Sequence, residues 1–349
     1  MSPVTAWMLA ACAAAGAASS SSHAQEAALT TDGTNPIVRD VFTADPAPLV
    51  VGDTLYLYVG HDNAAEGEMF TIPEWLCYST KDMKTWTAEG PVMRSDDFAW
   101  ARPDSAWASQ VVERDGTFYF YTTVRYADGQ EHSGSAVGVA TSDSPTGPFV
   151  DAIGEALVND GMTPGARRPW NDIDPTAFED DQGQWWISWG NGDCYLAKLG
   201  DDMTSIDGEI MNITDQLEHF EEGPWLHKRG ELYYLTYAYR DQAEMNSEQI
   251  AYATAERMAG PWTFRGKITG PGENSFTIHP GIAEFGGQWY LFYHDASLEI
   301  DGVKGTLGRR NVRAEYLHYN DDGTIRPIEQ TRRGVSAPPE RGEGRREDR

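Results

Sequence analysis

A chain of 349 residues can hold one large domain or two small ones, and an apolar content of 40% is typical of a globular protein. The formal net charge of −27 argues against nucleic acid and anionic membranes as partners, because both are bound through a basic surface. A neutral polymer would not be repelled by so acidic a surface.

The first 24 residues have the pattern of an export signal. The run from Ala6 to Ala18 is apolar but too short to span a membrane, and residues 22–24 form a small-x-small cleavage site. The segment from Leu9 to Cys12 also fits the lipidation box of a bacterial lipoprotein, with Cys12 as the attachment point. Either interpretation predicts a secreted or periplasmic protein, which a lipid could anchor, without a membrane span.

The body of the chain contains five copies of one pattern. Each copy has a polar or aromatic opening residue, an apolar strand, a turn at glycine and a second strand rich in Tyr, Trp and Phe. The opening residues are Asp45, Trp107, Asp174, Glu222 and His279, and the turn glycines are Gly52, Gly116, Gly183, Gly230 and Gly287. Repeats of this length, with several strands each, are typical of a propeller or an array.

A second recurring segment follows the strand pair and has the pattern of a strand, a polar turn and a closing aromatic. The copies of this segment are 78–86, 140–149, 196–203 and 252–262. Together these elements predict four-stranded blades, with the stretch 312–328 supplying the outer strands of the last blade. Because no window shows a sustained helical stripe, we predict an all-β fold, a five-bladed β-propeller over residues 25–330.

Two further features complete the organisation of the chain. Cys77 and Cys194 lie in different copies, make no disulfide framework, and are interpreted as small buried apolar residues. Residues 331–349 are rich in Pro, Gly, Glu and Arg without periodicity, so we expect a disordered tail there.

The opening residues carry the functional signal. Equivalent positions of a closed ring converge on its axis, so we expect all five to face one central pocket. Three of them are carboxylic acids, which a packed centre would not contain unless they were paired or used, since buried charge is costly. Pro46, Pro175 and Pro280 directly follow opening residues and predict an extended backbone there, which would aim the side chains.

Converging carboxylates in a rigid pocket suit the hydrolysis of a glycoside. One carboxyl must be protonated to donate to the leaving oxygen, and another must be ionised to activate water. A third carboxylate beside the acid would raise the pKa of that acid by repulsion between like charges. Asp45, Asp174 and Glu222 are sufficient for these three roles, but the residues alone do not assign them.

Five motifs occur in a fixed order along the chain: Thr43 to Pro48, Asn171 to Thr176, Glu222 to Pro224, Asn274 to Gly281, and Leu317 to Gly323. On these motifs the chain resembles glycoside hydrolase family 43 from about Asn35 to Ile328. The resemblance implies a five-bladed propeller and a hydrolysis reaction that inverts the configuration of the anomeric carbon. It also implies Asp45 as general base, Glu222 as general acid and Asp174 as the modulator of that acid's pKa.

The resemblance implies further site residues as well. His279 matches an axial histidine that lies beside a bound calcium ion or a water cluster in many members, so either a structural calcium ion or a water cluster is expected there, although the chemistry requires no cofactor. Arg310 matches an arginine that contacts the sugar, but this chain has Arg310-Asn-Val where the family usually has Arg-Ser-Val, and Arg309 is adjacent.

Three tryptophans are candidates for contact with sugar rings. Trp107 occupies an opening position, where a flat aromatic would stack on a sugar or pack in the core, and Trp100 and Trp170 lie in connections that we expect at the rim of the pocket.

The segment from Met69 to Trp75, with residues 78–86, looks most like arabinofuranosidases that trim arabinoxylan. We therefore expect an exo-acting α-L-arabinofuranosidase, a monomer that acts on plant cell-wall oligo- or polysaccharides. The alternatives are a β-xylosidase or another family 43 activity on arabinan or galactan. A sugar-binding propeller without catalysis is the alternative outside enzymes, although it would not need three carboxylates in register.

Overall fold

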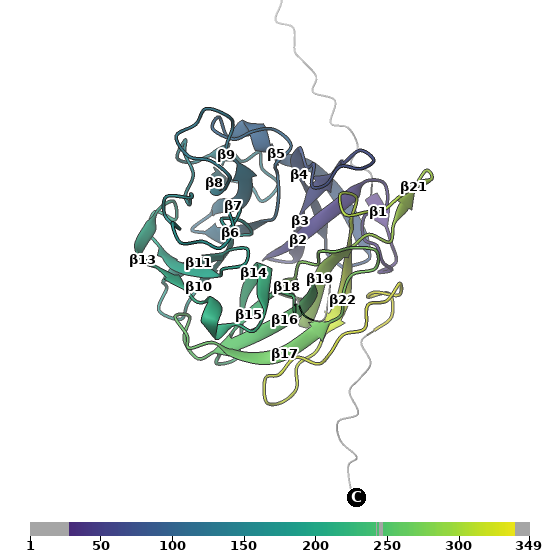
Figure 1. Cartoon of the computed structure of the whole chain (residues 1–349). Coiled ribbons are helices and arrows are strands. Elements are labelled where there is room, and N and C mark those ends of the chain that lie inside the picture. The colour runs from purple at the N-terminus through teal and green to yellow at the C-terminus, as the bar shows by residue number, and fades with distance from the viewer. Residues whose placement is uncertain (1–27, 242, 244–246, 339–349) are drawn as a thin grey trace, which may run out of the picture.

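The computed structural model describes residues 28–241, 243 and 247–338. The predicted leader and residues 339–349 of the predicted tail lie outside the described residues. Five antiparallel sheets of the described chain are arranged around a central axis, as Figure 1 shows. The prediction of an all-β, five-bladed propeller is confirmed.

Each sheet is a blade whose strands follow one another from the axis outward. The first blade contains β2 (Phe42–Val51), β3 (Thr54–Asp62), β4 (Glu74–Thr80) and β5 (Thr85–Arg94), with β1 (Ala28–Thr30) on its outer edge. The second contains β6 (Ser109–Arg114), β7 (Thr117–Arg125), β8 (Ser135–Ser142) and β9 (Val150–Asp151). The third contains β10 (Thr176–Glu179), β11 (Trp185–Trp189), β12 (Tyr195–Leu199) and β13 (Ile206–Asn212).

The last two blades complete the ring. The fourth contains β14 (Phe220–Arg229), β15 (Leu232–Tyr239), β16 (Gln249–Ala255) and β17 (Thr263–Thr269). The fifth contains β18 (Gly281–Phe285), β19 (Gln288–Asp295) and β22 (Asn311–Leu317). The remaining elements are the hairpin β20 (Glu299–Ile300) and β21 (Val303–Lys304) and two short 3₁₀ turns, η1 (Ser95–Asp97) and η2 (Thr214–Gln216).

The last blade departs from the predicted four strands. Within the stretch 312–328, residues 312–317 belong to β22, whereas Tyr319 and Ile325 form only an isolated bridge. The structure therefore gives three strands to this blade. The extra strand β1 lies instead on the outer edge of the first blade.

The ring is closed where the first and last blades meet. The backbone N–H of Thr43 donates to the carbonyl of Arg310, and that of Ile37 donates to the carbonyl of Val312. Strand β2 packs against both β18 and β19 of the fifth blade. This closure leaves the five inner strands, β2, β6, β10, β14 and β18, around one axis.

The folded region extends beyond the predicted boundary at residue 330. Val335 is buried and its N–H donates to the carbonyl of Gly33, while the N–H of Thr331 donates to Glu315. These contacts tie residues 331–335 to the first and last blades. The expected disordered tail is therefore wrong for this segment, because an apolar side chain within it is covered by the core.

Large aromatic side chains fill the space within and between the blades. The fully buried ones include Trp75, Trp86, Trp189, Tyr58, Tyr121 and Phe292. Cys77 and Cys194 are free and buried, as predicted. Within the described part of the chain, no helix is long and apolar enough to cross a membrane.

Candidate active site

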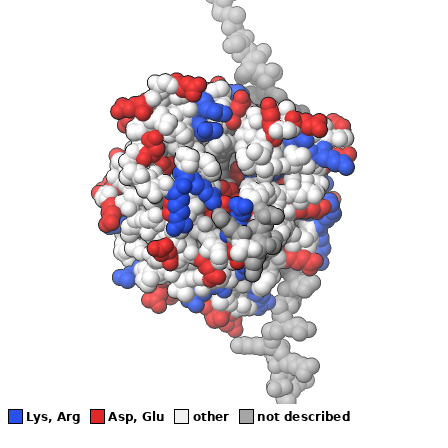
Figure 2. Space-filling view, in the orientation of Figure 1, with Lys and Arg blue, Asp and Glu red and all other residues white. Residues whose placement is uncertain are grey.

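All five opening residues line one pocket of about 250 Å³ on the propeller axis. The remaining lining residues are Phe70, Arg125, Trp170, Ile173, Asn191, Thr277 and Arg310. Figure 2 shows a hollow near the centre of this face, with basic side chains around it. The circular symmetry expected from the sequence thus brings residues far apart in the chain into one cavity.

The backbone at the opening positions differs from the prediction. Asp45 and Asp174 have φ values of 54° and 61°, in the left-handed region, rather than the extended conformation expected before proline. Proline disfavours the right-handed helical region for the residue before it but leaves the left-handed one open, and Asp tolerates that conformation better than most residues. The carboxylates are therefore aimed by a local turn of the chain.

Irregular strand pairing accompanies this turn. The register of β2 against β3 shifts between Ala44 and Ala47, which places an extra residue at Asp45. The register of β14 against β15 shifts on both sides of Glu222, and Gly223 adopts a φ of 59°. Bulges of this kind re-aim a side chain, and here they direct two carboxylates toward the axis.

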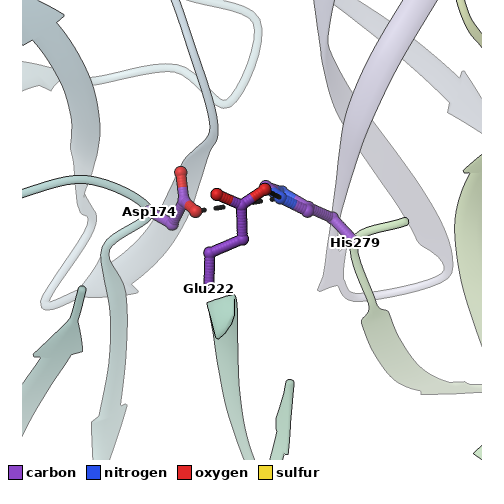
Figure 3. A group of neighbouring side chains, drawn as sticks. All are labelled: Asp174, Glu222 and His279. Carbon is purple, nitrogen blue, oxygen red and sulfur yellow. Dashed lines mark hydrogen bonds and ion pairs between the residues drawn. The ribbon is translucent and has the colours of Figure 1, made fainter. Parts of the chain in front are cut away.

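His279 lies between the carboxylates at the floor of the pocket. Its Nδ1 is 3.2 Å from Asp45 Oδ1, and its Nε2 is 3.0 Å from Glu222 Oε1 and 3.8 Å from Asp174 Oδ2. Figure 3 shows Asp174 and His279 on either side of the Glu222 carboxylate. Burial opposes a charge on the ring, but the three acids outweigh it and raise the pKa of His279 to about 10. The histidine is therefore a cation that donates to Asp45 and Glu222 and holds their carboxylates apart by the width of its ring.

Asp45 is kept ionised by its neighbours. Burial alone would raise the pKa of this carboxyl, but Arg310, His279 and His294 outweigh burial and hold the pKa well below its usual range. Arg310 Nη1 donates to Asp45 Oδ1 over 3.1 Å, and the N–H of Asp45 donates to His294 Nδ1. An ionised carboxylate in a fixed orientation can accept a proton from water, as a general base requires.

Asp62, which the sequence did not single out, fixes Arg310 in the site. It accepts from the Arg310 backbone N–H and Nε over 2.8 Å each, and from Nη2 over 3.0 Å. Asp62 and Arg310 are both buried. Arg309, the neighbouring candidate, instead donates to the carbonyls of Lys304 and Ala64, so the structure places Arg310 in the pocket.

Asp174 and Glu222 form a coupled pair beside His279. Burial, with repulsion from Glu222 and Asp45, outweighs the attraction of His279 and raises the pKa of Asp174 to about 8. For Glu222, burial is outweighed by the hydrogen bond and charge of His279, which lower its pKa. Because charge on one carboxyl disfavours charge on the other, the pair retains a proton near neutral pH and titrates as a unit. The Asp174–Glu222 pair thus carries a proton while Asp45 is ionised.

Asn191 orients the Glu222 carboxylate and was also missed by the sequence analysis. Its Nδ2 donates to Glu222 Oε2, while its Oδ1 accepts from Arg168 Nη1 and, over 3.2 Å, from Trp170 Nε1. These two donors fix which way the amide faces, so its NH₂ group points at the carboxylate. The residue lies between two glycines in the β11–β12 connection, and that turn pattern was the only local signal.

The three candidate tryptophans occupy different environments. Trp107 lines the pocket, and its Nε1 donates to the carbonyl of Phe70 over 3.1 Å. Trp170 lines the pocket at the rim and is 49% exposed. Trp100 does not line the pocket: it is buried against Phe98, and its Nε1 donates to Asp151. The prediction that Trp100 binds sugar is therefore corrected, because the core covers its ring.

The donor set around His279 does not suit the expected calcium ion. Asp174, Glu222 and His279 place one potential ligand atom each within 4.8 Å of one another. Calcium requires six to eight oxygen ligands, and a protonated imidazole has no lone pair to offer. Farther along the axis a cavity of about 20 Å³, lined by Pro46 and Pro175, has room for about one water molecule. These residues supply a hydrogen-bonded ion cluster rather than a calcium cage.

The proton held by the carboxyl pair predicts the alkaline limit of any acid-dependent reaction here. An acid with a raised pKa keeps its proton below that pKa and loses it as the pH rises through it, so kcat/KM should fall above about pH 8. Asp174→Asn removes the like charge beside Glu222 and should move this limit to lower pH. Profiles of kcat/KM against pH for both proteins check this, and an unmoved or raised alkaline limit would contradict it.

An ionised carboxylate across a pocket from a proton-bearing carboxyl pair is the arrangement that glycoside hydrolases use. Residues 33–325 match the model of glycosyl hydrolases family 43, and the chain belongs to this family. It is 27% identical over 345 residues to a xylosidase/arabinosidase from Humicola insolens, with 83% of this chain and 98% of the relative covered. The family resemblance inferred from the sequence is thereby confirmed.

Solved structures extend the similarity to the whole propeller. A β-xylosidase/α-arabinofuranosidase from a compost microbial metagenome, in complex with xylotriose and in a calcium-free form, has a TM-score of 0.72 at 28% identity, covering 86% of this chain and 98% of that one. An α-L-arabinofuranosidase from Clostridium thermocellum has a TM-score of 0.65 at 32% identity, covering 82% and 94% respectively. The chain is therefore a family 43 glycosidase.

Proposed function

We propose that this glycosidase is an inverting, exo-acting α-L-arabinofuranosidase that removes arabinofuranosyl residues from arabinoxylan or arabino-oligosaccharides. Asp45 accepts a proton from the attacking water, and Glu222 protonates the leaving oxygen. Asp174 keeps a proton available to Glu222 by disfavouring a second negative charge. The predicted leader supports an exported enzyme, which would meet its polysaccharide outside the cytoplasm.

The observation that carries the proposal is the position of His279 between the two reacting carboxylates. Each imidazole nitrogen contacts one of them, at 3.2 Å for Asp45 and 3.0 Å for Glu222. Direct attack by a carboxylate needs the two groups about 5–5.5 Å apart, whereas inversion needs about 6.5–9.5 Å so that water fits. A full imidazole ring between the carboxylates favours the wider spacing and hence inversion.

The shape of the pocket favours removal of a terminal or branch residue. Asp45, Asp174 and His279 form a floor, because the same three residues also line the small cavity between the prolines on its other side. A pocket that ends at the catalytic groups admits a chain end or a branch more readily than the middle of a polymer. Trp107 and Trp170 on the pocket wall supply flat surfaces for the residues that remain outside.

β-Xylosidase activity is the second candidate. The relative from the compost metagenome is described with both activities and was solved with xylotriose. Arabinofuranose and xylopyranose are both pentoses, so one pocket of this size can hold either. We favour the arabinofuranoside because the segment from Met69 to Trp75, which contains the pocket residue Phe70, resembles arabinofuranosidases.

One substrate panel tests the proposal. The purified protein is given aryl α-L-arabinofuranoside and aryl β-D-xyloside, and the first sugar anomer released is followed by proton NMR. We expect faster hydrolysis of the arabinofuranoside and initial release of the β-anomer. A clear preference for the xyloside would support the second candidate, and turnover of neither would contradict the proposed function.

A further inference from the structure

The arginines in the pocket and in the neighbouring connections differ in how their charge is balanced. Arg167 pairs with Asp193 over 3.2 Å, and Arg168 and Arg240 both pair with Glu221, over 2.8 and 3.3 Å. Each of these three cations therefore has an ion pair with one of two buried carboxylates of the protein itself, Asp193 and Glu221.

Arg125 has no such partner. It ends strand β7 and lines the pocket, and within the described part of the chain its guanidinium makes no ion pair or hydrogen bond with a carboxylate. A neighbouring charge is another cation, Arg102, which is exposed and whose backbone N–H donates to the carbonyl of Arg125; burial and this cation together lower the pKa of the Arg125 guanidinium. A partly buried guanidinium beside a like charge is unfavourable unless something else offsets it.

The position of Arg125 shows where an offsetting group would lie. Its guanidinium carbon is 5.9 Å from the centre of the Trp107 ring, which is itself held by the carbonyl of Phe70. Trp107 is an opening residue and lines the same pocket as the catalytic carboxylates. A ligand group that meets Arg125 is therefore attached to a sugar that already occupies the pocket or its mouth.

We propose that Arg125, with Arg102 behind it, binds the carboxylate of a uronic acid residue carried by the substrate outside the cleaved bond. The inference rests on the proposed glycosidase function of the pocket and names the class of substrate that it prefers. A guanidinium matches a carboxylate in geometry and charge, and charge-assisted hydrogen bonds of this type are about twice as strong as neutral ones. In a protein of net charge −27, a local pair of unneutralised arginines also offsets the general repulsion of an acidic substrate.

Binding to a catalytically disabled protein tests this inference separately from turnover. The background is Glu222→Gln, and the probes are a xylotriose with one arabinofuranosyl and one glucuronic acid branch and the same compound with its carboxyl reduced to an alcohol. Calorimetry should give roughly ten-fold tighter binding of the acidic probe, with the difference shrinking as salt is raised, as expected for one charge-assisted contact.

Variants at Arg125 and Arg102 test whether these two side chains cause the difference in affinity between the probes. Adding Arg125→Gln should remove the difference between the probes, Arg125→Lys should keep part of it, and Arg102→Gln should reduce it. Arg257→Gln, at an exposed arginine in the turn after β16, removes one charge away from the pocket and should change neither affinity.

Equal binding of the two probes by the parent protein would overturn the proposal. So would an equal loss for both probes with Arg125→Gln, since that would show a contact to neutral hydroxyl groups. If the protein cleaves neither furanoside nor xyloside while the acidic probe binds better, the proposed function fails but the carboxylate site stands.

Discussion

Glu222→Gln is expected to lower kcat on an arabinoside with a poor leaving group by about 10²–10⁴-fold, the usual contribution of a positioned general acid. The amide has nearly the same shape as the carboxyl and can remain beside Asn191 and His279, but it has no acidic proton to give. Asp45→Asn should lower kcat by a similar factor, because the amide cannot accept a proton from water. Steady-state kinetics on arabinoxylan oligosaccharides measure both losses.

The controls for these variants are chemical and structural. Glu284→Gln changes an exposed glutamate on β18, far from the pocket lining, and should leave kcat unchanged. Thermal unfolding should show that the two pocket variants remain folded. A loss of less than ten-fold in either folded variant would remove that residue from the proposed chemistry.

Replacing Arg310 is expected to have the largest effect on stability. Arg310→Met removes the guanidinium that pairs with both Asp45 and Asp62 and leaves two buried carboxylates without it. Breaking a buried ion pair by removing one partner costs about 3–5 kcal/mol, because the remaining charge is uncompensated. Denaturant unfolding at neutral pH should show a loss of this size in the free energy of unfolding, together with a loss of activity.

A second substitution tests whether unpaired charge is the cause. In the double variant Arg310→Met with Asp62→Asn, one stranded carboxylate is replaced by a neutral amide, so part of the lost stability should return. The single variant should also recover stability as the pH falls, since the stranded carboxyls then take up protons that the unfolded chain binds less tightly. If the two substitutions simply add their losses, the ion-pair explanation is wrong.

Much of the site could be predicted because its carboxylates stand at the same position of the repeated sequence pattern. Asp45, Asp174 and Glu222 occupy equivalent places in three copies, and a closed ring must bring such places together whatever the details of the loops. The glycine turns and aromatic strands set the number of blades for the same reason. Periodic features of a sequence thus carry through to the fold with little dependence on side-chain packing.

Residues whose role depends on non-repeating contacts could not be found in this way. Asp62 becomes a site residue only because Arg310, 248 positions later in the chain, lies against it. Asn191 acts through Arg168 and Trp170, which arrive from another connection. Trp100 shows the converse error, since its aromatic- and arginine-rich segment indicated a rim while tertiary packing placed the ring in the core.

The backbone at the catalytic positions illustrates a different limit. Proline after Asp45 and Asp174 indicated an extended conformation, which is the common outcome. The structure uses the less common left-handed one, with a register shift beside Asp45, and the carboxylates that result lie in the pocket. Local preference was overridden where the function of the site requires an unusual backbone.

Only the general acid acts on the leaving group, so changing the leaving group separates the role of Glu222 from that of Asp45 and tests the proposed mechanism most directly. The measurement is the hydrolysis by Glu222→Gln and Asp45→Asn of two arabinofuranosides, one with an alkyl alcohol and one with dinitrophenol as leaving group. Dinitrophenolate departs without protonation, so Glu222→Gln should recover most of its lost rate on that substrate while Asp45→Asn stays impaired on both. Equal rescue of the two variants, or rescue of Asp45→Asn alone, would contradict the assignment of acid and base on which the proposed mechanism depends.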